Sequence, residues 1–405
     1  MTPAGVPPAR ISPLGLFVFA RVCAAAGASA GPVVVAFVCV SLDGESGQLL
    51  ARALGAQVVG QLVSTFVSGA VVDRSARRTL MQVCYVAQAV VFATYAALLW
   101  AGQLPRPAIV ALAGCGGVIS GLVGPALQSV VPQLVPAEEL VRANGRLRTT
   151  VSVASVVAPA VAGGLLHRVG MSLSAAVVAA VFVAASVVVS FLPPLPRPEA
   201  RHFLRELVAG WVLFARTRWF AVVSVSCAVI NVLWAAVYAT WGPVRAVAVG
   251  WGAAGWGVIG SCFAAGLIVG ASIFGRVSFR HPVSAAVLGQ VGKAAPMVAL
   301  FLSDELWVVA AAAVVAGIGL ECFVIHFTST AQAVIPHADQ GKVFAVDAFV
   351  GLSLMPVGYW MAGAVERTVG PAGMGAAAVV AAAVVVAVAG AVGWWLRRQP
   401  AAAHT

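Results

Sequence analysis

The sequence predicts an all-α membrane protein with twelve transmembrane helices, and its composition is the first evidence for this class. Of the 405 residues, 61% are hydrophobic and only 9% are charged, whereas an ordinary soluble domain has about 25% charged residues. The mean hydropathy is +1.00. These values exclude a soluble fold, which needs charge on its surface, and a disordered chain, which is polar. They favour a chain built from apolar stretches of about 20 residues that cross a membrane.

The second observation is the number of stretches long enough to cross a hydrocarbon layer of about 30 Å as a helix. Helices are expected because the open edge of a sheet cannot form its hydrogen bonds in lipid. In chain order the twelve predicted helices cover residues 11–40, 48–72, 79–101, 108–131, 147–167, 171–192, 219–241, 251–275, 283–302, 306–330, 343–365 and 373–396.

The third observation is the uneven distribution of basic residues, which give the chain a net charge of +11. If the N-terminus lies inside, most of the 24 Lys and Arg residues fall in cytoplasmic segments, as the positive-inside rule requires. We therefore predict a multi-pass protein of the cell membrane with both termini cytoplasmic. The positive charge then reports membrane orientation and contact with the lipid bilayer, and no nucleic-acid partner is expected.

The longest polar segment, 193–218, divides the chain. It begins Pro-rich and continues with apolar residues at helical spacing, which indicates an amphipathic helix on the cytoplasmic membrane face. We predict an N-terminal six-helix bundle at 1–192, this linker, and a C-terminal six-helix bundle at 219–405. An internal repeat supports the division, because the segment 128–132 (QSVVP) recurs as 332–336 (QAVIP), 204 residues later. Such a 6+6 parallel repeat is expected for one large class of secondary transporters.

The most specific motif is SGAVVDRSARR at 68–78, in the loop between the second and third predicted helices. A carboxylate at this point can face the positive N-terminal end of a neighbouring helix. With its Gly, Asp and Arg positions, the segment resembles the corresponding loop of the major facilitator superfamily. The matching residues, which the resemblance implies act in gating, are Gly69, Asp73, Arg74, Arg77 and Arg78.

Two further segments, 130–148 and 332–346, are similar to the drug and siderophore exporters of that superfamily. The resemblance covers nearly the whole chain. It implies alternating access around a cavity lined by the first, fourth, seventh and tenth helices. It also implies that Asp73 docks against the start of the eleventh helix when the cavity opens outward.

The predicted fifth helix carries Pro159, Gly163 and Gly164, a loosened version of a motif associated with antiporters. One interpretation is an exporter whose fifth helix bends and packs closely; the other is ordinary packing of small residues between membrane helices. One departure from the family concerns the first helix. Many relatives have an acid after a glycine there, but here Gly27 is followed by Ala28.

A charge at mid-membrane costs about 3 kcal/mol, and three charges in the predicted spans stand out: Lys293, Glu321 and Asp347. Lys293 and Glu321 belong to adjacent predicted helices and lie at a similar depth, so we expect them to meet. In one interpretation Glu321 binds and releases the coupling proton, since a carboxyl group in an apolar cavity can exchange protons near neutral pH. In the other it forms a static pair with Lys293. Asp347 pairs with Lys342, pairs with an arginine such as Arg148, or caps its helix; a gating role is preferred.

Polar and aromatic side chains inside the spans are candidates for the substrate cavity. Asn231, Trp234 and Tyr238 share one helical face, and such a stripe suits an amphiphilic organic substrate. Interhelical hydrogen bonding is the equally supported alternative for these groups. The full set of cavity candidates is Asn231, Trp234, Tyr238, Gln57, Gln61 and Arg21, and for Arg21 snorkelling to lipid headgroups is the preferred interpretation.

We therefore predict a monomeric secondary transporter that exports a small organic compound, a drug or metabolite, in exchange for protons. The alternatives are an importer of the same fold and a transporter-like sensor or inactive homologue. No enzyme motif and no phosphate loop are found, and neither a cofactor nor a metal site is expected. The seven cysteines all fall in predicted apolar segments, which indicates buried small hydrophobic residues.

Overall fold

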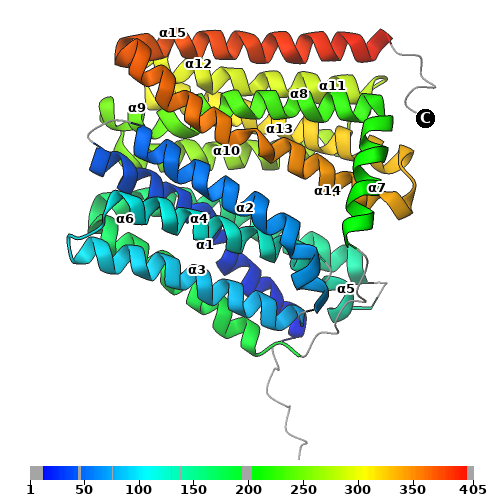
Figure 1. The fold of residues 1–405 in the computed structure, drawn as a ribbon, viewed down its shortest axis with the longest axis horizontal. Helices are drawn as coiled ribbons and strands as arrows, with labels where there is room; N and C mark the ends of the chain where they lie inside the picture. Colours follow the sequence, from blue (N-terminus) through cyan, green and yellow to red (C-terminus); the bar gives the residue numbers. More distant parts are fainter. Residues whose placement is uncertain are drawn as a thin grey trace, which may run out of the picture.

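The computed structural model describes residues 12–43, 47–74, 76–128, 130–136, 139–193 and 203–398, and within these ranges it contains helices and no strand. Ten of its helical segments are long and apolar enough to cross a membrane. Most of the long helices run side by side (Figure 1). The all-α membrane class is therefore confirmed. The count of twelve crossings, the orientation and the two-bundle division stay predictions.

The helices of the first half precede residue 193. They are α1 (Pro13–Asp43), α2 (Gln48–Arg74), α3 (Arg77–Trp100), α4 (Arg106–Gln128), the short α5 (Val131–Leu134) and α6 (Leu140–Ser190).

The second half begins with α7 and contains more short elements. They are α7 (Phe203–Arg216), α8 (Arg218–Trp234), a π-helical segment η2 (Ala235–Trp241), α9 (Gly242–Ala248), α10 (Gly252–Phe274), α11 (Pro282–Gly289), a 3-10 segment η3 (Gln290–Lys293), α12 (Ala294–Leu302), α13 (Leu306–Val334), α14 (His337–Ser353) and α15 (Met355–Arg398).

Two glycines break the two longest helices at matching places. Gly170 in α6 has φ +82°, and Gly370 in α15, 200 residues later, has φ +64°. Only glycine adopts such dihedrals without strain, so each break reverses the chain between two apolar helices. The apolar segment Gly145–Ser190 has 46 residues, about 69 Å if it were one straight helix. That length is more than twice a membrane core, and Gly170 divides it.

Several predicted boundaries were wrong. The fifth predicted helix begins at Leu140 instead of 147, because arginines at a helix end can remain in the aqueous phase. The seventh continues to Ala248 through the π-helical η2. The ninth is interrupted by η3. The eleventh begins at His337, directly after Pro336, with Asp339 in its first turn, where a carboxylate stabilises the helix dipole.

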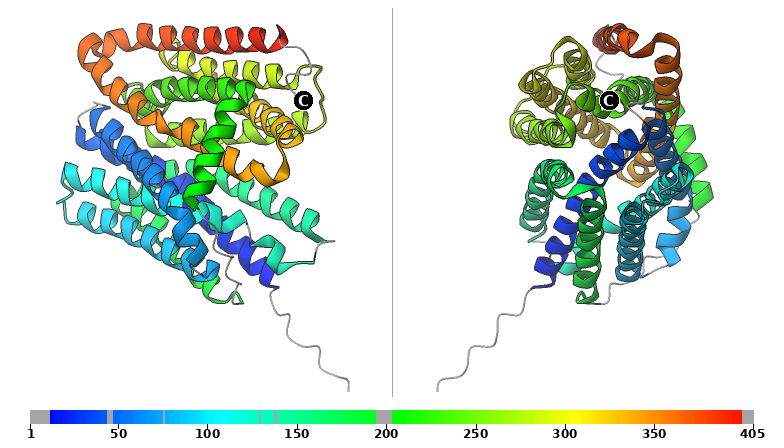
Figure 2. Two further views of the ribbon diagram at one scale, coloured as in Figure 1. Left: turned by 45° about the vertical axis from the view of Figure 1, so that its right-hand side comes forward. Right: turned by 90° about the vertical axis from the view of Figure 1, so that its left-hand side faces the viewer.

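The helices form two groups. In the end-on view of Figure 2, helices coloured blue to cyan gather together, and those coloured yellow to red form a second group. A buried cluster joins the groups: it combines Phe92 and Phe182 of the first half with Tyr238 and Trp256 of the second. The helix α7 lies across the others and contacts α14, where Trp211 packs on the edge of Phe349.

Close contacts between the groups involve glycines of α6 and α10. A Cβ at Gly163 would lie 2.2 Å from the carbonyl oxygen of Ala253, and one at Gly257 would lie 2.4 Å from that of Pro159. The backbone N–H of Ala160 donates to Ser261 Oγ at 3.2 Å. Because small residues let helix backbones approach, these positions hold the halves together.

Candidate functional site

A stripe of polar and aromatic side chains follows one face of α8 into η2. Its members are spaced 3, 4, 3 and 4 residues apart, which keeps them on one side of a helix. They are Ser224, Cys227, Asn231, Trp234 and Tyr238. The predicted triplet Asn231, Trp234 and Tyr238 therefore belongs to a longer stripe, and its neighbours in the structure determine what it can do.

The middle of the stripe holds a buried cation. Lys293 is 3% exposed, and its Nζ donates to Oδ1 of Asn231 at 2.8 Å. The same ammonium group lies 5.9 Å from the centre of the Trp234 ring, which is within the range of a cation–π contact. Among the described residues no carboxylate lies within 4 Å of Lys293. The expected pairing of Lys293 with Glu321 is therefore wrong.

Helix register explains why Lys293 and Glu321 do not meet. A Cβ at Gly292 would lie 2.8 Å from the carbonyl oxygen of Val315, so Lys293 is level with the middle of α13. Glu321 lies about six residues, or 9 Å, further along that helix. Its Cβ faces Gly270 of α10 instead, where an added Cβ would approach it to 2.8 Å. The two side chains thus point to different neighbours.

Glu321 pairs with Arg148 of the other half. The Arg148 Nη2 and Glu321 Oε1 atoms are 3.5 Å apart, and the two side chains are 76% and 10% exposed, respectively. Of the ion pairs that join two described residues, this one alone connects the first half with the second. A sheltered carboxylate is therefore held by a solvent-accessible arginine across the boundary between α6 and α13.

Asp347 of α14 lies at the other end of the α8 stripe. Its Oδ1 accepts a hydrogen bond of 2.5 Å from the hydroxyl of Ser224. Neither partner considered from the sequence contacts it, because Lys342 pairs with Asp339 at 2.8 Å and Arg148 pairs with Glu321. The gating role of Asp347 stays a prediction.

The aromatic end of the stripe is packed. Trp234 and Tyr238 stack with ring centres 4.1 Å apart, and Tyr238 also contacts Trp256 at 5.0 Å. The π-helical turn beginning at Ala235 alters the helical spacing here, and such turns are frequent at functional sites. Because Tyr238 is only 8% exposed, this face is helix packing in the described conformation.

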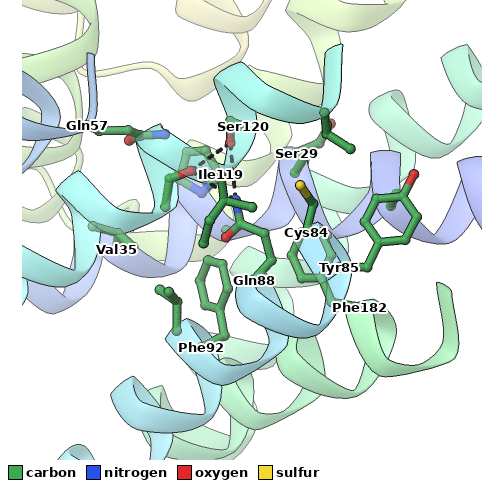
Figure 3. A pocket seen from close by; sticks show the side chains of 18 of the residues that line it. Ser29, Val35, Gln57, Cys84, Tyr85, Gln88, Phe92, Ile119, Ser120 and Phe182 are labelled. Carbon is green, nitrogen blue, oxygen red and sulfur yellow. Dashed lines mark hydrogen bonds between the residues drawn. The ribbon is translucent and has the colours of Figure 1, made fainter. Parts of the chain in front are cut away.

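A cavity of about 370 Å³ lies within the first half, among α1, α2, α3, α4 and α6. Arg21 and Gln57 line it, as expected from the sequence, but Gln61, Asn231, Trp234 and Tyr238 are not among its lining residues. Figure 3 shows Gln88 and Ser120 joined by a hydrogen bond, which is 3.1 Å long. A pocket of this size and mixed polarity can hold a small organic molecule.

The α3 side of this cavity consists of residues that were not predicted from the sequence. Tyr85, Gln88, Phe92 and Tyr95 all line it and are spaced 3, 4 and 3 residues apart. This is the same pattern that drew attention to Asn231, Trp234 and Tyr238. The stripe was therefore visible in the sequence, but its spacing alone could not tell a cavity wall from a packed face.

Part of the predicted gating loop lies outside the described side chains. The helix α2 extends to Arg74, but the surroundings of Gly69, Asp73 and Arg74 are not among those described. Arg77 and Arg78 begin α3, and the guanidinium of Arg78 donates to the carbonyl oxygen of Ser190 at the end of α6. This contact joins the start of α3 to the end of α6, both in the first half. The gating role of the loop stays a prediction.

The two glycines of the fifth-helix motif differ in their surroundings. A Cβ at Gly163 would meet the backbone of α10, whereas one at Gly164 would have no atom within 4 Å. The carbonyl oxygen of Pro159 lies against Gly257 of α10. The motif therefore places Pro159 and Gly163 at the contact between the halves, while Gly164 takes no part in it.

These features define an all-α membrane protein with buried charges and an internal cavity, the architecture of a solute transporter. The family model described as Major Facilitator Superfamily matches residues 17–359. The chain belongs to that superfamily.

Two curated proteins with similar sequences agree with this family assignment. The chain is 31% identical over 163 residues to the Enterobactin exporter EntS of Shigella boydii, covering 39% of this chain and 37% of the relative. It is 24% identical over 189 residues to the Uncharacterized MFS-type transporter y4rN of Sinorhizobium fredii, covering 45% and 46%. The chain thus matches less than half the length of these curated relatives.

Solved structures show the same fold. The nucleoside transporter NupG superposes with a TM-score of 0.76 at 12% identity, covering 96% of this chain and 99% of that one. A bacterial homologue of the iron transporter ferroportin in an inward-facing state gives 0.74 at 14% identity, with coverage of 96% and 99%.

Proposed function

We propose that this protein is a secondary active transporter of the cell membrane that exports a small organic compound in exchange for protons, acting as a monomer and without enzymatic activity. The observation that carries the proposal is the Arg148–Glu321 pair, which connects α6 of one half with α13 of the other. The similarity to EntS, an exporter, supports the direction of transport.

The pair suggests how proton binding and movement can be linked. Protonation of Glu321 removes the negative charge that attracts Arg148, so it weakens a link between the halves. A rearrangement that separates α6 from α13 in turn leaves the carboxylate without its arginine and favours proton uptake. Two processes that each change the equilibrium of the other are coupled, and the coupling is reciprocal.

The test begins with cells that carry or lack the gene. A panel of drugs and metabolites is applied, and accumulation of each compound is measured. We expect lower accumulation of at least one compound when the protein is present. Protein-dependent uptake would favour an importer, and no effect on any compound would favour a sensor or an inactive homologue; both outcomes contradict the proposal.

Glu321→Gln tests the coupling step on the compound so identified. In vesicles, we expect this variant to lose gradient-driven transport at least tenfold while retaining substrate exchange, which needs no net proton movement. Exchange also reports that the variant is folded. Glu305→Gln, at an exposed glutamate outside the helices, is the matched control and should behave as wild type. Wild-type coupling in Glu321→Gln at normal expression would eliminate the proton role of Glu321.

A further inference from the structure

We infer that the cavity in the first half is the substrate site and that it binds an organic anion, an aromatic carboxylate. In this assignment the carboxylate lies on Arg21 and the ring lies against Phe92 and Phe182. The inference rests on the proposed transport function and adds the substrate class to it. Three properties of the cavity carry it: its charge, its uncommitted hydrogen-bonding groups and its aromatic wall.

The charge of the cavity lining comes from Arg21. Among the described residues that line the cavity, Arg21 is the one charged side chain. Among the described residues no carboxylate lies within 4 Å of Arg21. Ala28 lines the cavity at the position where the sequence lacks an acid after Gly27. A positive site without a counter-ion attracts an anion and repels a cation, so a cationic substrate is disfavoured.

Several polar groups that line the same cavity have no hydrogen-bond partner in the part of the chain that the structure describes. The hydroxyl of Tyr85 is buried beside the guanidinium of Arg21, but it makes no hydrogen bond of normal geometry. The side chains of Ser29, Ser155 and Gln57 line the cavity without a hydrogen bond to another described residue. A buried polar group without a partner is costly, and a carboxylate bound at Arg21 would supply an acceptor for the Tyr85 hydroxyl.

The apolar part of the cavity is aromatic. The rings of Phe92 and Phe182 are stacked with centres 6.0 Å apart. A Cβ at Gly31 would lie 2.6 Å from the Phe92 ring, and one at Gly27 would lie 2.7 Å from the Phe182 ring. These glycines of α1 therefore let both rings lie against the helix. Aromatic rings pack on one another with specific geometry, which favours a planar aromatic ligand over an alkyl chain.

The cavity is also long enough for such a molecule. Its lining residues in α1 extend from Arg21 to Val35, a length of about 21 Å along the helix axis. The cation is at one end of this range, and Gly27 and Gly31 lie further along. A ligand with an acidic group at one end of a planar body matches this order.

The test measures binding to the purified full chain in neutral detergent, independently of transport. Three probes of similar shape differ in charge: 2-naphthoate, its neutral amide, and cationic 2-(aminomethyl)naphthalene. We expect 2-naphthoate to bind at least tenfold more tightly than the other two, because a hydrogen bond to a charged partner is stronger than a neutral one. Arg21→Gln should lose this preference, because the affinity for 2-naphthoate falls to near that for the amide.

Two variants separate charge from folding. Arg21→Lys keeps the charge and should retain most of the preference, whereas Arg280→Gln, at an exposed arginine outside the cavity, should bind as wild type. Failure of 2-naphthoate to bind, equal binding of all three probes, or an unchanged preference in Arg21→Gln would overturn the inference. Displacement of 2-naphthoate by phosphatidylglycerol would assign the site to a lipid headgroup and also overturn it.

Failure of the anion site can be distinguished from failure of the proposed transport function. Anion binding at Arg21 without any export in cells would contradict the transport proposal and leave the site standing. Export that is unaffected by Arg21→Gln would contradict the site and leave the transport proposal standing.

Discussion

Gly163→Ala should reduce transport at least about fivefold, whereas Gly164→Ala should leave it unchanged. The added methyl group at Gly163 would lie 2.2 Å from the carbonyl oxygen of Ala253, and the one at Gly164 would meet no atom within 4 Å. Both variants replace glycine by alanine in adjacent positions of one helix, so their effects on helix propensity are matched. The difference between them therefore isolates the contact between α6 and α10.

The expected size follows from the cost of overpacking. Forcing extra atoms into a packed contact costs about 1–3 kcal/mol, and a conformation disfavoured by that amount loses about 5- to 150-fold in population. The described conformation, in which the halves touch at Gly163, would become rare. The proposed transport cycle passes through each of its conformations, so the whole cycle slows.

Transport of the compound found in the cell panel is the first measurement. Hydrogen exchange at the amides of α6 and α10 is the second, and it should be faster in Gly163→Ala because the contact is loosened. Gly257→Ala provides an independent repeat, since its methyl group would lie 2.4 Å from the carbonyl oxygen of Pro159. Equal transport by Gly163→Ala and Gly164→Ala would show that the close approach is not needed.

The sequence was sufficient for the class of protein and for most helices, because these depend on composition and on the length of apolar stretches. The ends of the helices were predicted less accurately, for a physical reason. The arginines near 142–148 lowered the local hydropathy, but α6 begins at Leu140 all the same. A helix continues as long as its backbone is hydrogen-bonded, and hydropathy reports only where lipid begins.

The charge network shows what spacing cannot reveal. Lys293 and Glu321 were expected to meet because they lie at similar depths in neighbouring helices. The 3-10 segment at Gln290–Lys293 turns the chain by 120° per residue instead of 100°, which adds a rotation of about 80° over four residues. Lys293 therefore faces Asn231 of α8. Depth can be counted along a sequence, but the direction of a side chain depends on such local departures.

The cavity illustrates the same limit. Gln57 and Arg21 were identified because polar residues are rare in apolar spans, and both line the cavity. The α8 stripe met the same criterion and lies in the packed interior. What distinguishes the two is the space opposite the stripe: the α3 residues Tyr85, Gln88, Phe92 and Tyr95 border a cavity of about 370 Å³, whereas Trp256 of α10 packs against Tyr238.

Asn231→Leu should destabilise the protein by about 2–3 kcal/mol, because it removes the hydrogen-bond acceptor of a buried lysine. Lys293→Met should cost little or nothing on its own, since an apolar side chain of similar size needs no partner. In the double variant the loss caused by Asn231→Leu should shrink by at least about 1.5 kcal/mol. Asn231 also donates to the carbonyl oxygen of Gly351 at 3.3 Å, but that contribution is lost in both backgrounds and cancels.

The wild type, the two single variants and the double variant form a double-mutant cycle. Their free energies of unfolding can be measured in mixed micelles, and the coupling energy is the departure from additivity. Lys342→Met supplies the control. It removes the chain's other lysine, which pairs with Asp339 and is partly exposed, so its effect should add to that of Asn231→Leu without coupling.

Strict additivity between Asn231→Leu and Lys293→Met would mean that Lys293 draws no stabilisation from this amide. The buried charge would then have to be stabilised by the ring of Trp234, and Trp234→Leu should be coupled to Lys293→Met instead.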